Sequence, residues 1–140
     1  MINIIKNAQK NGDTVGGKFQ VIISGAPYGL GSYTSWNRKI NAKLAESISS
    51  INAIKSVSFG KDSSSSSFGS ELHDEIEYSN NQYKRTNNNS GGIEGGMSNG
   101  QNILINAEMK PLSTLTKPLK SIDIKTKKTK LAHKERTDSC

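Results

Sequence analysis

Apolar and polar residues alternate along two stretches of the chain, with the period of two that is typical of a half-buried strand. Residues 18–24 form the first stretch and residues 102–109 the second, which Pro111 brings to an end. The apolar positions are Phe19, Val21 and Ile23 in the first and Ile103, Ile105, Ala107 and Met109 in the second. Both stretches are predicted to be strands, and residues 54–59 and 73–78 are predicted to be two shorter ones.

Apolar residues recur every three or four positions in two other segments, and this spacing predicts amphipathic helices. The stronger pattern covers residues 37–51, where Thr34 or Ser35 is placed to cap the helix. Its apolar face consists of Ile40, Leu44, Ile48 and Ile51. The weaker pattern covers residues 2–10 and ends at the glycines of NGDTVGG, which suit the end of a helix.

The order of these elements predicts the fold class. A last hairpin is expected from residues 121–124 and 130–136, on either side of TKKT. Because neighbouring strands are joined both by helices and by loops, the chain is predicted to be α+β with a mixed or antiparallel sheet. The serine-rich residues 60–70 are predicted to be a low-complexity surface loop.

Five glycines and four asparagines fall within RTNNNSGGIEGGMSNGQ, residues 85–101, directly before the last long strand. Glycine permits positive φ and a close approach of the backbone to a ligand, and asparagine tolerates the same left-handed region. A loop of this composition can present several backbone N–H groups to an anion or to a flat polar ring.

The charge of the chain limits the partners that it could bind. The net charge is +7 and the pI is near 9.5, which favours a nucleic acid, a membrane surface or a phosphorylated small molecule. The one cysteine, Cys140, has no second cysteine in the chain to pair with, which fits a protein of the reducing cytosol. No apolar run approaches membrane-spanning length, and the first residues lack a signal-peptide core. The sequence therefore predicts a soluble, intracellular protein.

Three motifs have simpler interpretations than their catalytic ones. GDTVGGKF, residues 12–19, nearly fits a phosphate-binding loop, but Phe19 replaces the hydroxyl and a strand follows where a helix is needed. The run HDE, residues 73–75, would alternate between the two faces of a strand, which predicts a surface polar cluster rather than a metal site. Residues 120–136 are strongly basic but lack the aromatic residues that stack on single-stranded nucleic acid, which predicts a solvated hairpin.

Two short motifs could address an oxyanion. In ERTD, residues 135–138, an extended backbone would turn Arg136 and Asp138 the same way, so that the arginine could bind an oxyanion and the aspartate handle a proton. In MKPLST, residues 109–114, a lysine and two hydroxyls follow a strand and could form a phosphate cradle. From the residues alone, a surface ion pair is favoured for the first motif and an ordinary loop is an equal alternative for the second.

These motifs occur in the order and spacing of one enzyme family. GAPYGLGSYTSWNRKINAKLAESISSINAIKSVSFG is followed by GSELHDEI, RTNNNSGGIEGGMSNGQ, MKPLSTLTKPLKSIDI and ERTDSC. Over nearly all of its 140 residues the chain resembles chorismate synthase, and the RTNN…GGIEGGMSNG block is highly specific. The implied fold is part of the β-α-β sandwich of that family.

The resemblance implies a phosphate-lyase that uses reduced FMN. The family removes phosphate and a ring proton from 5-enolpyruvylshikimate 3-phosphate in a 1,4-anti elimination that gives chorismate, the last common step of the shikimate pathway to the aromatic amino acids. The flavin is not consumed. The resemblance also implies a link to NADP, a cytoplasmic location and a homotetramer, with neither nucleic acid nor membrane as a partner.

The resemblance further implies site residues in this sequence. Arg136 would contact flavin or substrate oxyanions, and Asp138 would lie near the reactive flavin nitrogen as a candidate for proton removal. No metal ligand is implied. The implied flavin contacts are Asn52, Ala53, Gly95, Lys110, Pro111, Leu112, Ser113, Thr114 and Arg136.

The chain departs from the family mainly in length. Family members are well over twice as long, and their N-terminal part carries both catalytic histidines, which His73 and His133 do not match. Residues 1–140 are therefore expected to be a partial domain that is inactive by itself, because groups that act as a unit fail together. A second interpretation stays open, in which the chain is a basic, non-catalytic module that holds anions.

Overall fold

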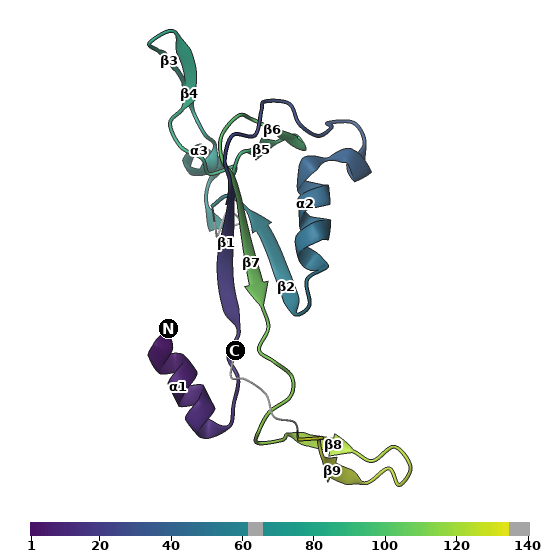
Figure 1. The fold of residues 1–140 in the computed structure, drawn as a ribbon. Coiled ribbons are helices and arrows are strands. Elements are labelled where there is room, and N and C mark those ends of the chain that lie inside the picture. The colour runs from purple at the N-terminus through teal and green to yellow at the C-terminus, as the bar shows by residue number, and fades with distance from the viewer. Residues whose placement is uncertain (62–65, 135–140) are drawn as a thin grey trace. The chain divides into compact units, whose positions relative to one another are not determined.

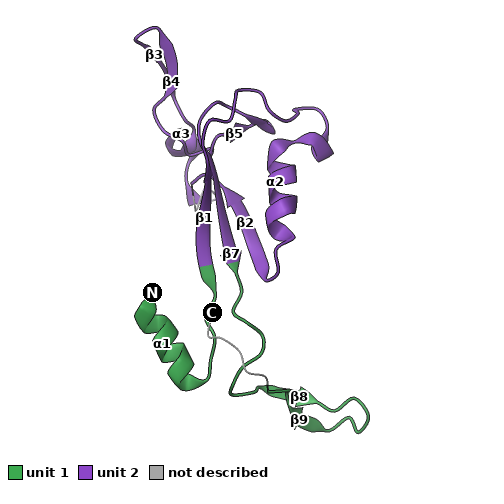
Figure 2. Ribbon diagram, viewed as in Figure 1, with its two compact units in different colours: residues 1–17, 109–140 green, residues 18–108 purple. Residues whose placement is uncertain are grey.

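The computed structural model describes residues 1–61 and 66–134, and the chain divides into two compact units (Figure 2). Unit 2 is Lys18–Glu108, and unit 1 combines Met1–Gly17 with Met109–Cys140. The elements of unit 2 are β1 (Gly17–Ile23), η1 (Trp36–Arg38), α2 (Ile40–Ser49), β2 (Ile54–Phe59), α3 (Gly69–Leu72), β3 (Ile76–Ser79), β4 (Gln82–Arg85), β5 (Ile93–Glu94), β6 (Met97–Ser98) and β7 (Ile103–Met109). Those of unit 1 are α1 (Ile2–Asn11), β8 (Lys120–Ile122) and β9 (Thr129–Leu131).

The main sheet of unit 2 has three strands in the order β1-β7-β2 (Figure 1). Lys18 on β1 pairs with Glu108 on β7 at 3.7 Å, and Gln20 donates a 2.8 Å hydrogen bond to Asn106. Residue numbers therefore rise along β1 as they fall along β7, so the two strands are antiparallel. The arrow of β2 also points opposite to that of β7 (Figure 1). β1 and β2 thus run the same way on either side of β7 and are connected through α2, as in a split β-α-β unit.

The core of unit 2 lies on β7, as the alternation in the sequence predicted. Ile103, Ile105 and Ala107 are each 1% exposed, whereas Met109 at the end of the strand is 37% exposed. α2 packs against β2, whose first residue, Ile54, is also buried. Full burial of an isoleucine side chain stabilises a fold by about 1.5–3 kcal/mol, so these few side chains hold the sheet together. The predicted α+β class with an antiparallel sheet is confirmed.

The start of α2 differs from the prediction. The helix begins at Ile40, and Ser35 stands instead at the N-cap of η1, where the described residues show no side-chain capping hydrogen bond. The predicted cap from Thr34 or Ser35 is therefore wrong. The first N–H of α2, on Ile40, instead donates a 2.9 Å hydrogen bond to the carbonyl of Gly96, which lies 56 positions later in the sequence.

The region from residue 73 to residue 101 holds two short hairpins. The predicted strand at 73–78 is displaced to β3 and continues through a tight turn at Asn80 and Asn81, both at positive φ, into β4, which sequence reasoning missed. Tyr78 and Tyr83 face each other across this hairpin. The segment predicted as an Asn/Gly loop contains the second hairpin, β5–β6.

Unit 1 contains the predicted N-terminal helix and the predicted basic hairpin. α1 ends at Gly12, whose φ of 68° is the left-handed conformation that glycine favours. Ala8 is its buried residue, whereas Ile2 is 68% exposed. β8 pairs with β9 in antiparallel register, and β9 ends at Leu131. Within residues 1–61 and 66–134, no helix is long and apolar enough to span a membrane.

Candidate functional site

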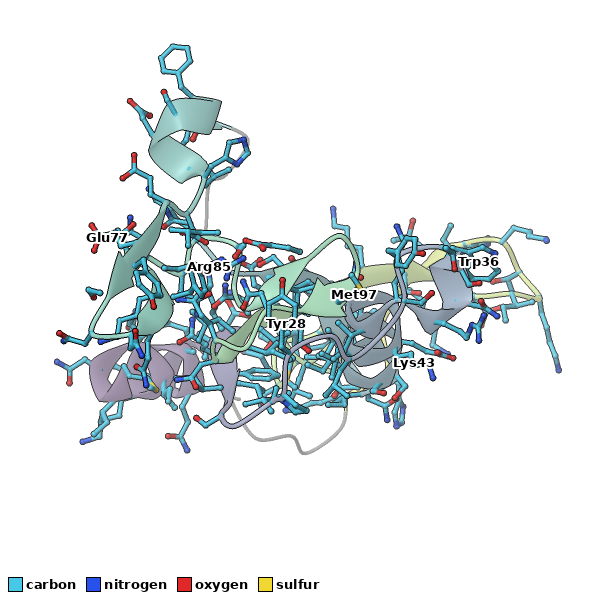
Figure 3. The ribbon with its side chains drawn as sticks, turned by 90° about the horizontal axis from the view of Figure 1, so that it is seen from above. Tyr28, Trp36, Lys43, Glu77, Arg85 and Met97 are labelled. Atoms are coloured by element: carbon cyan, nitrogen blue, oxygen red, sulfur yellow. The ribbon has the colours of Figure 1, made fainter. Side chains whose placement is uncertain are left out.

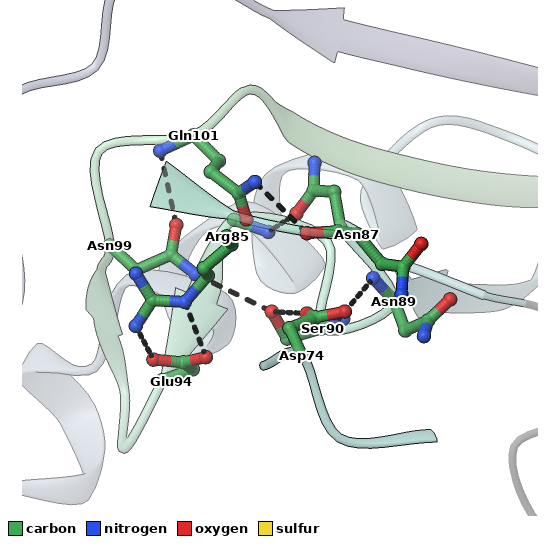
Figure 4. A network of polar contacts seen from close by, with 10 residues as sticks. Asp74, Arg85, Asn87, Asn89, Ser90, Glu94, Asn99 and Gln101 are labelled. Atoms are coloured by element: carbon green, nitrogen blue, oxygen red, sulfur yellow. Dashed lines mark hydrogen bonds and ion pairs between the residues drawn. The ribbon is translucent and has the colours of Figure 1, made fainter. Parts of the chain in front are cut away.

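The Asn/Gly loop, residues 85–101, folds around the carboxylate of Asp74 (Figure 4). Asp74 Oδ1 accepts a 2.8 Å hydrogen bond from the N–H of Asn89, and Oδ2 accepts hydrogen bonds from the N–H of Ser90 at 2.9 Å and from its hydroxyl at 2.8 Å. Burial alone would raise the pKa of Asp74, but the hydrogen bonds from Ser90 and Asn89, with the charge of Arg85, lower it below the ordinary value of 3.8. The carboxylate is therefore ionised near neutral pH and holds the loop as an anion.

A second charged contact joins the same loop to β4. The guanidinium of Arg85 binds the carboxylate of Glu94 at two points, with Nε donating to Oε1 at 3.1 Å and Nη2 donating to Oε2. Only 13% of the Arg85 side chain is exposed, and it lies toward the body of unit 2, whereas Glu77 on β3 lies at the outer edge (Figure 3). A two-point pair of this kind fixes geometry as well as charge. Glu94 directly precedes Gly95, so the contact sets the position of the β5–β6 turn.

Gly95 forms the tip of the β5–β6 hairpin. It is exposed at φ 59°, and no atom of the described residues beyond its chain neighbours lies within 4 Å of where a Cβ would stand. The next residue is fixed, because the carbonyl of Gly96 accepts hydrogen bonds from Ile40 and Ser32. The backbone at this tip is therefore fixed in position by its neighbours but is exposed, so that a flat ring can approach it closely.

The same loop contains a buried acceptor that lacks a donor. Gln101 donates from Nε2 to the carbonyl of Asn87 at 3.0 Å, but its Oε1 is buried without a hydrogen-bond partner among the described residues. An unpaired buried carbonyl costs about 1–3 kcal/mol, so this atom is suited to accept an N–H from a ligand.

The turn after α2 carries the next pair of predicted contacts. Asn52 is exposed, and Ala53 adopts φ 71°, a conformation that residues with a side chain rarely occupy. Such outliers cost about 1–3 kcal/mol and gather at ligand-binding sites. The observation supports the assignment of a functional role to this turn.

The structure does not bring this turn and Gly95 together within unit 2. Gly96 contacts the first residue of α2, whereas Asn52 and Ala53 follow its last turn. α2 has 10 residues, which separates its two ends by about 15 Å.

The segment Lys110–Thr114 belongs to unit 1, where GDTVGGKF holds it in place. The hydroxyl of Thr14, a residue that is 9% exposed, donates a 2.8 Å hydrogen bond to the carbonyl of Leu112. The backbone at Gly16 passes so close that a Cβ there would stand 2.5 Å from the carbonyl oxygen of Met109. This glycine-rich motif therefore supports the segment while Lys110, Pro111, Leu112 and Ser113 remain exposed and Thr114 is half-buried.

Comparison with known proteins identifies the family. The family model for chorismate synthase matches residues 1–140 of the chain. The chain belongs to the chorismate synthase family. It is 50% identical over 142 residues to the chorismate synthase of Alkaliphilus metalliredigens and 49% identical to those of Listeria monocytogenes and Bacillus pumilus, with all of the chain covered in each case.

The chorismate synthase relatives also establish the extent of the match. The chain spans 37% of the Alkaliphilus and Listeria proteins and 36% of the Bacillus protein, so it corresponds to little more than a third of their length. A solved structure titled "Crystal Structure of Chorismate Synthase" matches with a TM-score of 0.75 and 40% sequence identity, over 79% of this chain and 34% of that one. The resemblance seen in the motifs is thereby confirmed.

The predicted flavin contacts Asn52, Ala53, Gly95 and Lys110–Thr114 lie in turns or loops of the structure. Arg136 and Asp138, the predicted catalytic pair, lie outside the described residues. His73 and Glu75 are exposed, as predicted for a surface polar cluster, but the predicted strand at 73–75 is wrong, because these residues precede β3, and Asp74 is a half-buried acceptor. No local signal marks Asp74, since its donors lie 15 and 16 positions away.

Proposed function

We propose that this chain is part of a chorismate synthase that converts 5-enolpyruvylshikimate 3-phosphate into chorismate by 1,4-anti elimination of phosphate, with reduced FMN as the cofactor. The observation that carries the proposal is the uncovered backbone at Gly95, held on either side by Glu94 and Gly96 within a family-specific loop. The free acceptor of Gln101 adds a partner for a ring N–H among the described residues.

The proposed roles of the remaining residues are those that the family motifs imply. Arg136 binds an oxyanion of flavin or substrate, and Asp138 takes part in removal of the ring proton. Lys110 supplies positive charge beside the hydroxyls of Ser113 and Thr114. When bound, reduced FMN would supply electron density for cleavage of the C–O bond. The proposed flavin contacts are Asn52, Ala53, Gly95, Lys110, Pro111, Leu112, Ser113, Thr114 and Arg136.

The setting proposed for this activity is a cytoplasmic homotetramer of the full-length enzyme, with a link to NADP. The net charge of +7 suits the anionic substrate and cofactor. The 140-residue chain by itself is expected to form no chorismate. No comparison favours the alternative of a non-catalytic anion-binding module.

The test uses the Listeria monocytogenes relative with its matching segment replaced by this chain, here called the chimaera. The chimaera is expected to bind FMN and to form chorismate. Gly95→Ala is expected to raise the FMN Kd at least about tenfold, because a methyl group occupies the open approach to the backbone. The readouts are flavin titration and chorismate formation.

Gly25→Ala is the matched control. Gly25 also has positive φ, 75°, and no described residue beyond its chain neighbours within 4 Å of a Cβ, so the backbone strain is the same. It lies outside the Asn/Gly loop, and its substitution is expected to leave the FMN Kd unchanged. Equal effects of the two substitutions, or a chimaera that binds no FMN, would contradict the proposed function.

A further inference from the structure

We propose that Asp74 is a positioning residue for FMN, acting through the Asn/Gly loop rather than by touching the cofactor. The inference rests on the proposed function, since it deepens the role of the loop that presents Gly95. Asp74 is not among the flavin contacts that the family resemblance implies.

Asp74 accepts three hydrogen bonds from a segment far along the chain. Its two oxygens accept two backbone N–H groups and one hydroxyl, all from Asn89 and Ser90. These residues lie 15 and 16 positions further along the chain. The contact therefore ties the start of the loop to the segment before β3, a connection that the local backbone cannot make.

Hydrogen bonds connect the segment around Ser90 to the β5–β6 hairpin. The side chain of Asn88 accepts a 2.8 Å hydrogen bond from the N–H of Gly92, and the N–H of Asn99 donates to the carbonyl of Gly92 at 2.9 Å. Asn99 also donates from its side chain to the hydroxyl of Ser90 at 3.4 Å. The end of the hairpin at Asn99 is thus linked to Ser90, which Asp74 holds (Figure 4), and the end at Gly92 is linked to Asn99 and to Asn88, the neighbour of Asn89.

Close packing of the backbone restricts the Asn/Gly loop to one arrangement. A Cβ at Gly91 would stand 2.3 Å from the backbone N of Gly60, and a Cβ at Gly92 would stand 2.5 Å from the carbonyl oxygen of Asn102. Two backbones in such contact adopt one arrangement or separate. Asp74 supplies the ionic hydrogen bonds that favour the packed arrangement, and Gly95 is positioned as a consequence.

The test combines a structural and a functional measurement. Amide hydrogen exchange of residues 88–96 is measured in the 140-residue chain, and FMN affinity and kcat are measured in the chimaera. Asp74→Asn removes the charge and, whichever way the amide turns, places its NH₂ group against one backbone N–H donor, that of Asn89 or that of Ser90. It is expected to speed exchange in the loop and to raise the FMN Kd about tenfold, with a much smaller fall in kcat at saturating FMN.

Two further variants make the test specific. Asp74→Glu keeps the carboxylate one methylene further out, and it is expected to restore part of the FMN affinity, which also decides the matter if the Asn variant does not fold. Asp123 in the β8–β9 turn accepts the same set of donors, two backbone N–H groups and one hydroxyl. Asp123→Asn is therefore the matched control and is expected to leave loop exchange and FMN Kd unchanged.

Three results would overturn the inference: loop exchange that does not change in Asp74→Asn, faster exchange with an unchanged FMN Kd, or an equal rise of Kd in Asp123→Asn. The first two leave the proposed function standing, because the unsubstituted chimaera still binds FMN. If the unsubstituted chimaera binds no FMN and forms no chorismate, the proposed function fails and the flavin role of Asp74 fails with it.

Discussion

Two aspartates in this chain accept the same kinds of donor, but from residues at very different separations along the sequence. In the β8–β9 turn, Asp123 Oδ1 accepts the N–H groups of Lys125 and Thr126, at 3.0 and 2.8 Å, and the hydroxyl of Thr126 at 3.1 Å. In unit 2, Asp74 accepts two N–H groups and one hydroxyl at similar distances. The donors of Asp123 lie two or three positions away, whereas those of Asp74 lie 15 or 16 positions away.

The difference in sequence separation determines what each carboxylate can do. An aspartate that binds N–H groups two and three residues later forms a turn that the unfolded chain also samples. Such a contact shapes its own turn and little else. Asp74 closes a much longer loop, which costs conformational entropy that only the folded packing offsets. Asp74 therefore couples the Asn/Gly loop to the fold, while Asp123 acts within one hairpin.

Backbone packing shows the same contrast. Beside the Asn/Gly loop, Gly60 and Gly91 both have positive φ, and their backbones touch. In the β8–β9 turn the residue at positive φ is Lys127, at 57°, so that position accommodates a long side chain. Close approach of two backbones requires glycine, whereas an exposed turn does not.

The largest expected effect comes from Gly60→Ala. A Cβ at this position would stand 2.0 Å from the carbonyl oxygen of Asn89 and 2.7 Å from the N of Gly91, at a φ of 71°. Backbone atoms cannot yield as a flexible side chain does, so the Asn/Gly loop must separate from the sheet. We expect a loss of about 4 kcal/mol in the free energy of unfolding, measured by urea denaturation followed by circular dichroism.

Gly29→Ala is the control for backbone strain alone. Gly29 has φ 86°, and its Cβ would meet no atom of the described residues within 4 Å apart from its chain neighbours. Only the left-handed conformation is penalised there, by about 1 kcal/mol. Equal shifts of the urea midpoint for both variants would show that the contact between Gly60 and the loop does not matter.

The second prediction compares how much each aspartate contributes to the free energy of unfolding as the pH is lowered. The pKa of Asp74 is below 3.8 in the folded chain, so its ionised form favours folding. Its stabilisation is complete above about pH 3.8 and is lost as the pH falls through the lower, folded-state pKa. Asp74→Asn is therefore expected to lower the free energy of unfolding by about 2 kcal/mol near neutral pH, with a difference from the unsubstituted chain that shrinks in acid.

The same measurement on Asp123→Asn sharpens the comparison. Hydrogen bonds from Thr126 also lower the pKa of Asp123. Asp123→Asn is therefore also expected to lower the free energy of unfolding near neutral pH, with a difference that shrinks in acid. Because its donors lie within one local turn, we expect a smaller change than for Asp74→Asn at every pH. A larger change at Asp123 would reverse the assignment of the long-range role.

The contrast between the aspartates also explains which features the sequence could predict. The spacing of apolar residues and the identity of turn residues are local properties of the sequence. They were enough to predict β7, α2 and the β8–β9 hairpin. The cap of α2 by the carbonyl of Gly96 and the donors of Asp74 join distant segments. Their chemistry is common to many polar residues, so no local pattern distinguishes them. The position of Gly95 was predicted from the family motif, but the contacts that hold it were not.

The smallest expected effect tests the tolerance of the local turn. Lys127 holds φ 57° while its N–H donates a 2.9 Å hydrogen bond to the carbonyl of Asp123. Lys127→Gly removes a left-handed penalty of about 1 kcal/mol and adds an entropy cost to folding of about 0.5–1 kcal/mol. The melting temperature is therefore expected to stay the same or to rise by a few degrees.

Asn81→Gly in the β3–β4 turn is the comparison for this last change. Asn81 has φ 65°, but asparagine tolerates this region, and its side chain accepts a 2.8 Å hydrogen bond from the hydroxyl of Tyr78. Substitution there loses a contact and relieves less strain, so the melting temperature is expected to fall slightly. A fall for Lys127→Gly as large as that for Asn81→Gly would mean that the β8–β9 turn depends on its lysine. The view that this turn is fixed locally by Asp123 alone would then be wrong.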